Sequence, residues 1–156
     1  MCSSDLQIGF FFLVGHGLPW SMVDAVYGQA RRLHALDETV KEAIPMSAQQ
    51  GGYLRLGGGT SYASAIAGEV RKPNLNAAFF VHRGGYREGN QWPPLEGFRE
   101  TVDAYIDAMT ALAHRLLPLY ALALDLDPDH FAPSFDVPST TLRLDRKSTR
   151  LNSSHT

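Results

Sequence analysis

The sequence contains a single cysteine, Cys2, among its 156 residues. One thiol cannot form an intramolecular disulfide, nor can it supply the paired cysteines of the common zinc sites. We therefore expect a reducing, cytoplasmic environment.

Long apolar runs are also missing. The longest, residues 8–14, has about seven residues, whereas a membrane-spanning helix needs roughly 20. We expect no membrane partner.

Positive charge is scarce and scattered. Three of the 14 Lys and Arg follow position 145, which leaves 11 against 16 Asp and Glu in residues 1–145. Proteins that bind nucleic acids usually present clustered basic side chains that follow the phosphates. We therefore expect no nucleic-acid partner. The hydrophobic fraction of 44% and the charged fraction of 19% are those of an ordinary globular domain.

The spacing of apolar residues predicts extended and helical segments. The expected elements are, in chain order, a buried strand over residues 8–14, a helix over 19–36, a short helix over 37–43, a second strand over 75–81, a long helix over 95–124 and a third strand beginning at 139–144. Residues 46–73 are rich in Gly, Ser and Ala and show no sustained period, which predicts a long loop of the kind that often forms a lid.

The long helix carries the strongest periodic signal. Apolar residues from Leu95 to Leu124 fall on one wide stripe, and charged residues occupy the other side. Pro118 lies within it and should kink or break it, because proline lacks a backbone donor and clashes with the preceding turn. A stripe of this kind packs on a core or binds a partner. A non-catalytic helical protein-binding module that uses residues 95–124 as its interaction face is therefore an alternative function. Exposed apolar surface of this kind also favours self-association.

The two ends differ from the body of the chain. Residues 1–6 and 146–156 share neither its period nor its composition, and both resemble translated sequencing-adapter sequence. We expect one domain over residues 7–145, a non-domain segment at 1–6 and a disordered tail at 146–156. The tail has one large apolar side chain, Leu151, so little burial would offset the conformational entropy lost on ordering it.

Several short motifs occur in the order typical of one enzyme family. They are Gly9 to Gly17 (GFFFLVGHG), Leu36 to Lys41 (LDETVK), Gly52-Tyr53, Lys72 to Asn76 (KPNLN), Asn90 to Pro93 (NQWP) and Leu122 to Leu126 (LALDL). Together they resemble the N-terminal region of non-haem Fe(II)/2-oxoglutarate-dependent dioxygenases of the isopenicillin-N-synthase-like family. The resemblance implies an α+β fold in which helices pack on the first strands of an incomplete double-stranded β-helix, or jelly roll.

The same resemblance implies an oxidoreductase activity for the full-length parent protein. Such an enzyme uses Fe(II) and 2-oxoglutarate to hydroxylate, desaturate or cyclise a small organic substrate. Its iron is held by two His and one carboxylate, and its His-x-Asp motif comes after the segment that resembles residues 140–144. The resemblance therefore predicts a chain that ends before the iron site.

The histidines of the chain do not supply such a motif. None is followed two positions later by Asp or Glu. His34 and Glu38 are spaced i, i+4, which would suit a ligand pair but more often reflects a surface contact on a helix. We therefore expect no catalytic residue and no metal ligand in this chain, and we expect neither Fe(II) nor 2-oxoglutarate to bind it.

Three polar residues are candidates for substrate binding: Tyr53, Arg55 and Asn76. They lie in or beside the predicted loop, where the resemblance places the wall or lid of a substrate pocket. The alternative for each is an exposed loop residue without a role in binding.

Overall fold

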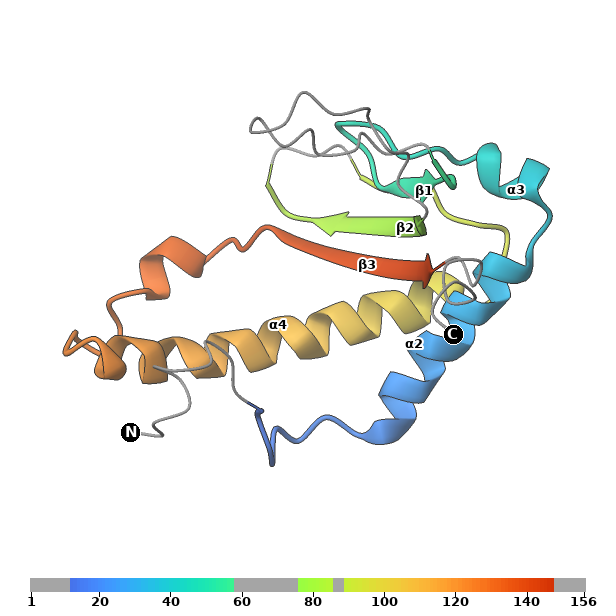
Figure 1. Ribbon diagram of the computed structural model, residues 1–156. Coiled ribbons are helices and arrows are strands. Elements are labelled where there is room, and N and C mark those ends of the chain that lie inside the picture. Colours follow the sequence, from blue (N-terminus) through green and yellow to red (C-terminus); the bar gives the residue numbers. More distant parts are fainter. Residues whose placement is uncertain (1–11, 58–75, 86–88, 148–156) are drawn as a thin grey trace, which may run out of the picture.

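Two helices cover one face of a small antiparallel sheet in the computed structural model, which describes residues 12–57, 76–85 and 89–147 (Figure 1). The helices are α2 (Trp20–Ala35) and α4 (Phe98–Ala123), and they pack against each other. The sheet has the order β1-β2-β3, with β1 at Gly52–Leu54, β2 at Asn76–Arg83 and β3 at Thr140–Lys147. A short helix α3 (Glu38–Glu42) and a 3-10 turn η1 (Ala132–Phe135) complete the described elements. The predicted α+β class is confirmed.

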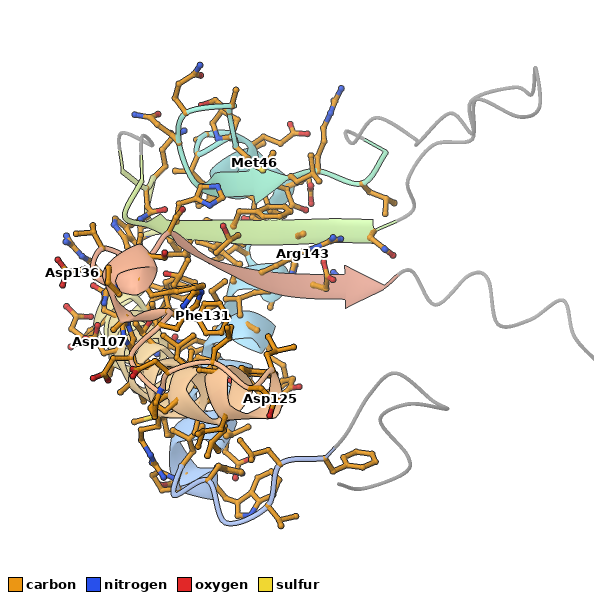
Figure 2. All side chains as sticks on the ribbon, turned by 90° about the vertical axis from the view of Figure 1, so that its left-hand side faces the viewer. Met46, Asp107, Asp125, Phe131, Asp136 and Arg143 are labelled. Carbon is orange, nitrogen blue, oxygen red and sulfur yellow. The ribbon has the colours of Figure 1, made fainter. Side chains whose placement is uncertain are left out.

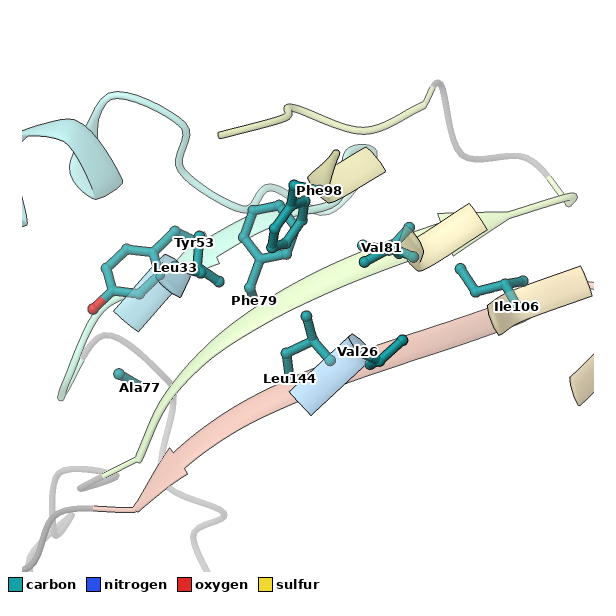
Figure 3. Packing of buried hydrophobic residues seen from close by; sticks show 10 residues of the cluster. Val26, Leu33, Tyr53, Ala77, Phe79, Val81, Phe98, Ile106 and Leu144 are labelled. Carbon is teal, nitrogen blue, oxygen red and sulfur yellow. The ribbon is translucent and has the colours of Figure 1, made fainter. Parts of the chain in front are cut away.

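The core lies between the sheet and the two helices. Phe79 of β2 and Phe98 of α4 are fully buried and meet edge to face, with ring centroids 5.5 Å apart. Val26 and Leu33 of α2 and Leu144 of β3 belong to the same cluster (Figure 3). Burial of large apolar side chains contributes roughly 1.5 to 3 kcal/mol each, so this cluster is the main source of stability for the described residues.

The predicted helices and the second and third strands are confirmed, with ends shifted by a few residues. Pro19 is the N-cap of α2 rather than its first residue, and Asp37 is the N-cap of α3. Of the kink or break predicted at Pro118, the break is wrong, because α4 continues through this residue to Ala123. Extensive packing of α4 on α2 and the sheet holds the helix together despite the missing donor.

The first predicted strand is wrong over the residues that the structure describes. Phe12, Leu13 and Val14 belong to no strand, and the side chains of Phe12 and Val14 are 88% and 84% exposed. An extended apolar segment forms a strand only where a neighbour satisfies its backbone donors and acceptors, and among the described residues no strand pairs with this one. Residues 8–11 lie outside the described residues.

A strand forms inside the segment predicted to be a loop. β1 covers Gly52–Leu54 and pairs with β2 so that Tyr53 lies opposite Phe79. A Cβ on Gly52 would stand 2.6 Å from the carbonyl oxygen of Ile44, so only glycine allows this close approach. Three residues are too few to show an alternating pattern, which is why the sequence did not reveal β1. Residues 58–73 of the predicted lid lie outside the described residues.

The apolar stripe of the long helix divides into two halves. Phe98, Val102 and Ile106 in the first half are almost fully buried against the sheet and α2. Leu119 and Leu122 in the second half are 59% and 56% exposed. The stripe is therefore not one continuous interaction face, which contradicts the protein-binding alternative over its first half.

Ordered structure continues past the predicted boundary at residue 145. Arg146 and Lys147 are the last residues of β3 and lie opposite Ala77 and Asn76 of β2. Arg146 also donates a hydrogen bond to the carbonyl oxygen of His34, at 3.2 Å. Strand β3 therefore runs two residues past residue 145, because pairing with β2 satisfies the backbone there, and the bounds of the domain stay a prediction. Residues 148–156 lie outside the described residues.

Candidate functional site on the outer face of the sheet

The sheet has a second face, turned away from α2 and α4, that carries polar side chains. Successive residues of a strand point to opposite faces. Because Phe79 and Leu144 point toward the helices, their neighbours in the strands point away. We call this surface the outer face, and it is formed by Phe80 and His82 of β2 and Thr141, Arg143 and Asp145 of β3.

Strand register brings these side chains together in pairs. Phe80 lies opposite Arg143, and His82 lies opposite Thr141. The Arg143 guanidinium lies 5.3 Å from the centroid of the Phe80 ring, within the range of a cation–π interaction. Its Nε donates a hydrogen bond to Oδ1 of Asp145 at 2.7 Å. Figure 2 shows Arg143 on β3, beside β2.

His82 is buried on the same face and is held on two sides. Its ring Nδ1 lies 2.9 Å from Oγ1 of Thr141. The side-chain amide of Asn90 accepts a hydrogen bond from His82 N at 2.7 Å and donates one to His82 O at 2.8 Å. Since β1 pairs with β2 only over residues 78–80, Asn90 takes the place of a neighbouring strand at His82.

Tyr53 lies on the opposite side of the sheet from this face. It is 5% exposed, and its hydroxyl donates a hydrogen bond to Oε1 of Glu38 at 3.0 Å. Burial, together with the hydrogen bond to Glu38, raises the pKa of Tyr53 to about 12. The Nζ of the buried Lys41 lies 5.4 Å from the ring centroid and 2.8 Å from Oε2 of Glu38. Tyr53 is thus part of the interior packing.

Arg55 and Asn76 lie at one end of the sheet. Arg55 follows β1, is exposed, and forms a 3.9 Å ion pair with Glu42. Asn76 is the first residue of β2, is half-buried, and by strand alternation lies on the outer face. The structure therefore does not bring the three predicted residues into one site. A role in substrate binding stays a prediction for each of them.

The alternating pattern of β3 already indicated a polar outer face. The predicted substrate-binding residues instead come from the loop and its neighbours. Residues 140–144 alternate, and Arg143 stands on their polar side. In an antiparallel sheet covered on one side, such alternation places the polar side chains on the uncovered face, so the pattern predicted that Arg143 lies on the outer face. His82 carried no comparable signal, because the partner of its ring, Thr141, is 59 positions away in the sequence.

The described residues do not provide a site for iron. No group of three His, Cys, Asp or Glu side chains able to hold a metal gathers within residues 12–57, 76–85 and 89–147. His34 and Glu38 are engaged separately: His34 Nε2 lies 3.1 Å from the carbonyl oxygen of Leu144, while Glu38 binds Tyr53 and Lys41. Burial lowers the pKa of His34. We therefore derive no chemical step through iron from these residues.

The chain belongs to the family described as non-haem dioxygenase in morphine synthesis, N-terminal, whose model matches residues 5–98. It is 27% identical over 144 residues to a probable iron/ascorbate oxidoreductase of Dictyostelium discoideum, covering 83% of this chain and 40% of that protein. It is 30% identical over 139 residues to the homoarginine-6-hydroxylase 2-ODD-C23 of Glycine max, covering 80% and 40%. The chain thus spans about two fifths of the length of these curated relatives.

A solved structure has the same fold over most of the chain. A full-length Neurospora crassa protein, in complex with alpha-KG and thymine, superposes with a TM-score of 0.66 at 18% identity, covering 81% of this chain and 42% of that one. This likeness confirms that the helices and sheet correspond to part of a double-stranded β-helix fold. Within the part of the chain that the structure describes, no helix is long and apolar enough to cross a membrane.

Proposed function

We propose that this chain is the N-terminal part of an Fe(II)- and 2-oxoglutarate-dependent oxygenase that acts on a small organic substrate. The observation that carries this proposal is the match of residues 5–98 to the N-terminal family of non-haem dioxygenases. Relatives that match over about 40% of their own length are named as an iron/ascorbate oxidoreductase and a hydroxylase, which supports oxidation as the chemistry.

In this proposal the chain supplies structure and substrate contacts rather than cofactor ligands. Helices α2 and α4 support the sheet from one side. The outer face, with Phe80 and Arg143 paired across β2 and β3, forms a wall of the substrate pocket. Fe(II) and 2-oxoglutarate bind to the part of the parent protein that the curated relatives contain beyond the region they share with this chain. We place the parent protein in the cytoplasm.

The test requires the coding DNA beyond Asp145 and the protein that it encodes. We expect a His-x-Asp motif downstream, and Fe(II)-dependent consumption of 2-oxoglutarate by the purified full-length protein. An open reading frame that ends without this motif, together with no consumption of 2-oxoglutarate, would refute the proposal.

The 156-residue chain serves as the matched control. Because its described residues contain no cluster of metal-binding side chains, anaerobic calorimetric titration with Fe(II) should show no stoichiometric site. A one-to-one site of micromolar affinity in this chain would contradict the assignment of the cofactor ligands to the rest of the protein.

A further inference from the structure

We propose that Arg143 is a specificity-determining residue that receives a carboxylate group of the substrate on the outer face. Arg143 lies near the middle of β3, opposite Phe80, and its side chain is 41% exposed. The carboxylate-bearing ligand is identified as the substrate on the basis of the function proposed above.

The guanidinium of Arg143 is held at one edge and on one face. Its Nε donates to Asp145, and the ring of Phe80 lies 5.3 Å away. Its two terminal nitrogens donate to no acceptor among the residues that the structure describes. Two parallel N–H groups at the end of a planar guanidinium match the two oxygens of a carboxylate. The guanidinium is thus held in a fixed orientation, and the edge that carries its two terminal nitrogens is available to bind a ligand.

Arg83 shows what a structural arginine looks like in the same sheet. It points to the helix side, and its two terminal nitrogens bind Asp103 and Asp107 of α4. Its hydrogen-bonding capacity at that end is therefore used within the protein. Arg143, by comparison, has one acidic partner within the described part of the chain, Asp145, and it binds at Nε.

The neighbours of Arg143 narrow the class of ligand. Asp145 places a negative charge within hydrogen-bonding distance of the guanidinium, so the Arg143–Asp145 pair has no net positive charge for a multiply charged anion. The planar fork of the guanidinium instead selects a ligand with two oxygens in one plane, as in a carboxylate. The Phe80 ring beside the guanidinium offers an apolar surface on which the body of an aromatic or aliphatic acid can pack.

The test compares benzoate with benzamide, which match in shape and differ in charge. Binding to the full-length protein is measured by calorimetry without iron or 2-oxoglutarate. We expect benzoate to bind more tightly, and Arg143→Met to reduce this preference by about 10- to 100-fold, the usual loss when a charged hydrogen-bonded pair is broken. Arg143→Lys keeps the charge without the planar fork, so it should restore part of the preference. Arg99→Met, on the exposed side of α4, should leave it unchanged.

Three results would overturn the inference: equal binding of benzoate and benzamide, an unchanged preference in Arg143→Met, or an equal loss in Arg99→Met. Circular dichroism of each variant excludes misfolding, and Arg143→Lys provides the second variant if the Met variant does not fold. Consumption of 2-oxoglutarate is measured separately on the wild-type protein. Arg143-dependent binding of benzoate without that activity would support the carboxylate site and refute the proposed oxygenase function.

Discussion

Tyr53 connects the interior of the sheet to α3 through its hydroxyl group. The hydroxyl donates to Glu38, which in turn binds the buried Lys41. The pKa of Tyr53 is raised to about 12, because burial and the nearby carboxylate disfavour the tyrosinate form. A raised pKa means that the folded state holds the proton more tightly than the unfolded state. The resulting stability is complete below about pH 10, the ordinary tyrosine value, and is lost as the pH rises toward 12.

We therefore predict that Tyr53→Phe lowers the free energy of unfolding at neutral pH by about 1 kcal/mol, the usual value of one hydrogen bond. The variant should also lose less stability than the wild type between pH 10 and 12. Urea denaturation at several pH values measures both effects. Tyr27→Phe is the control, because Tyr27 is 63% exposed. If wild type and Tyr53→Phe lost the same amount of stability between pH 10 and 12, a group other than Tyr53 would be responsible for the loss.

Asn90 is the second residue whose substitution should be costly. Its amide binds both backbone groups of the buried His82, and Ala in its place would leave an N–H and a carbonyl without these partners. We predict that Asn90→Ala lowers the free energy of unfolding by about 2 to 3 kcal/mol. Gln91→Ala, which removes an exposed hydrogen bond to the carbonyl oxygen of Pro45, should cost less than about 1 kcal/mol. Similar losses in both variants, measured by urea denaturation, would argue against the bridging role of Asn90.

At the scale of elements, α4 determines how the sheet is supported. Its first half is buried on the sheet and α2, and its second half continues through Pro118 into solvent-exposed apolar residues. Proline within a helix lacks one donor and costs about 3 kcal/mol relative to alanine. The helix tolerates this because packing on both sides of Pro118, where Leu112 and Ala121 are buried, holds it in place rather than local propensity.

Replacement of the proline should therefore stabilise the helix. We predict that Pro118→Ala raises the free energy of unfolding by about 1 to 3 kcal/mol and increases helix content. Thermal denaturation followed by circular dichroism tests both changes. The matched control is Ala111→Ser, at an exposed position of the same helix, which should have a small effect. A destabilised Pro118→Ala variant would mean that the proline ring makes packing contacts worth more than the missing hydrogen bond.

At the scale of the whole molecule, several large apolar side chains have no cover among the described residues. Trp20 is 76% exposed, Leu119 is 59% and Leu124 is 61%. Exposed apolar patches promote association when they exceed a few hundred Å². The curated relatives are more than twice as long as the region they share with this chain, so in them further sequence is available to cover such a surface.

We predict that the isolated 156-residue chain self-associates at micromolar concentration and binds a hydrophobic dye. Replacement of Leu119 and Leu122 by Gln should reduce both effects, whereas Arg31→Gln, at an exposed position of α2, should change neither. Light scattering and dye fluorescence make the measurements. A monodisperse wild-type monomer that binds no dye would refute this prediction.

The sequence by itself determined the features that depend on short-range periodicity or on motifs in order. The spacing of apolar residues was sufficient for α2, α4 and the strands β2 and β3, because a buried face repeats every 3.6 or 2 residues. The ordered motifs were sufficient for the family. The same reasoning did not reveal β1, and it predicted a strand that includes Phe12–Val14, because a strand is stabilised by partners that lie elsewhere in the chain.

Only the tertiary structure decided which polar side chains share a surface. Strand register places Arg143 beside Phe80 and His82 beside Thr141, although 63 and 59 positions separate the members of each pair along the chain. It also places Tyr53 in the interior and Asn76 on the outer face, residues that sequence reasoning had grouped together. A shift of one residue in register would move each side chain of a strand to the other face. Local sequence does not encode that choice, which depends on how the sheet packs against α2 and α4.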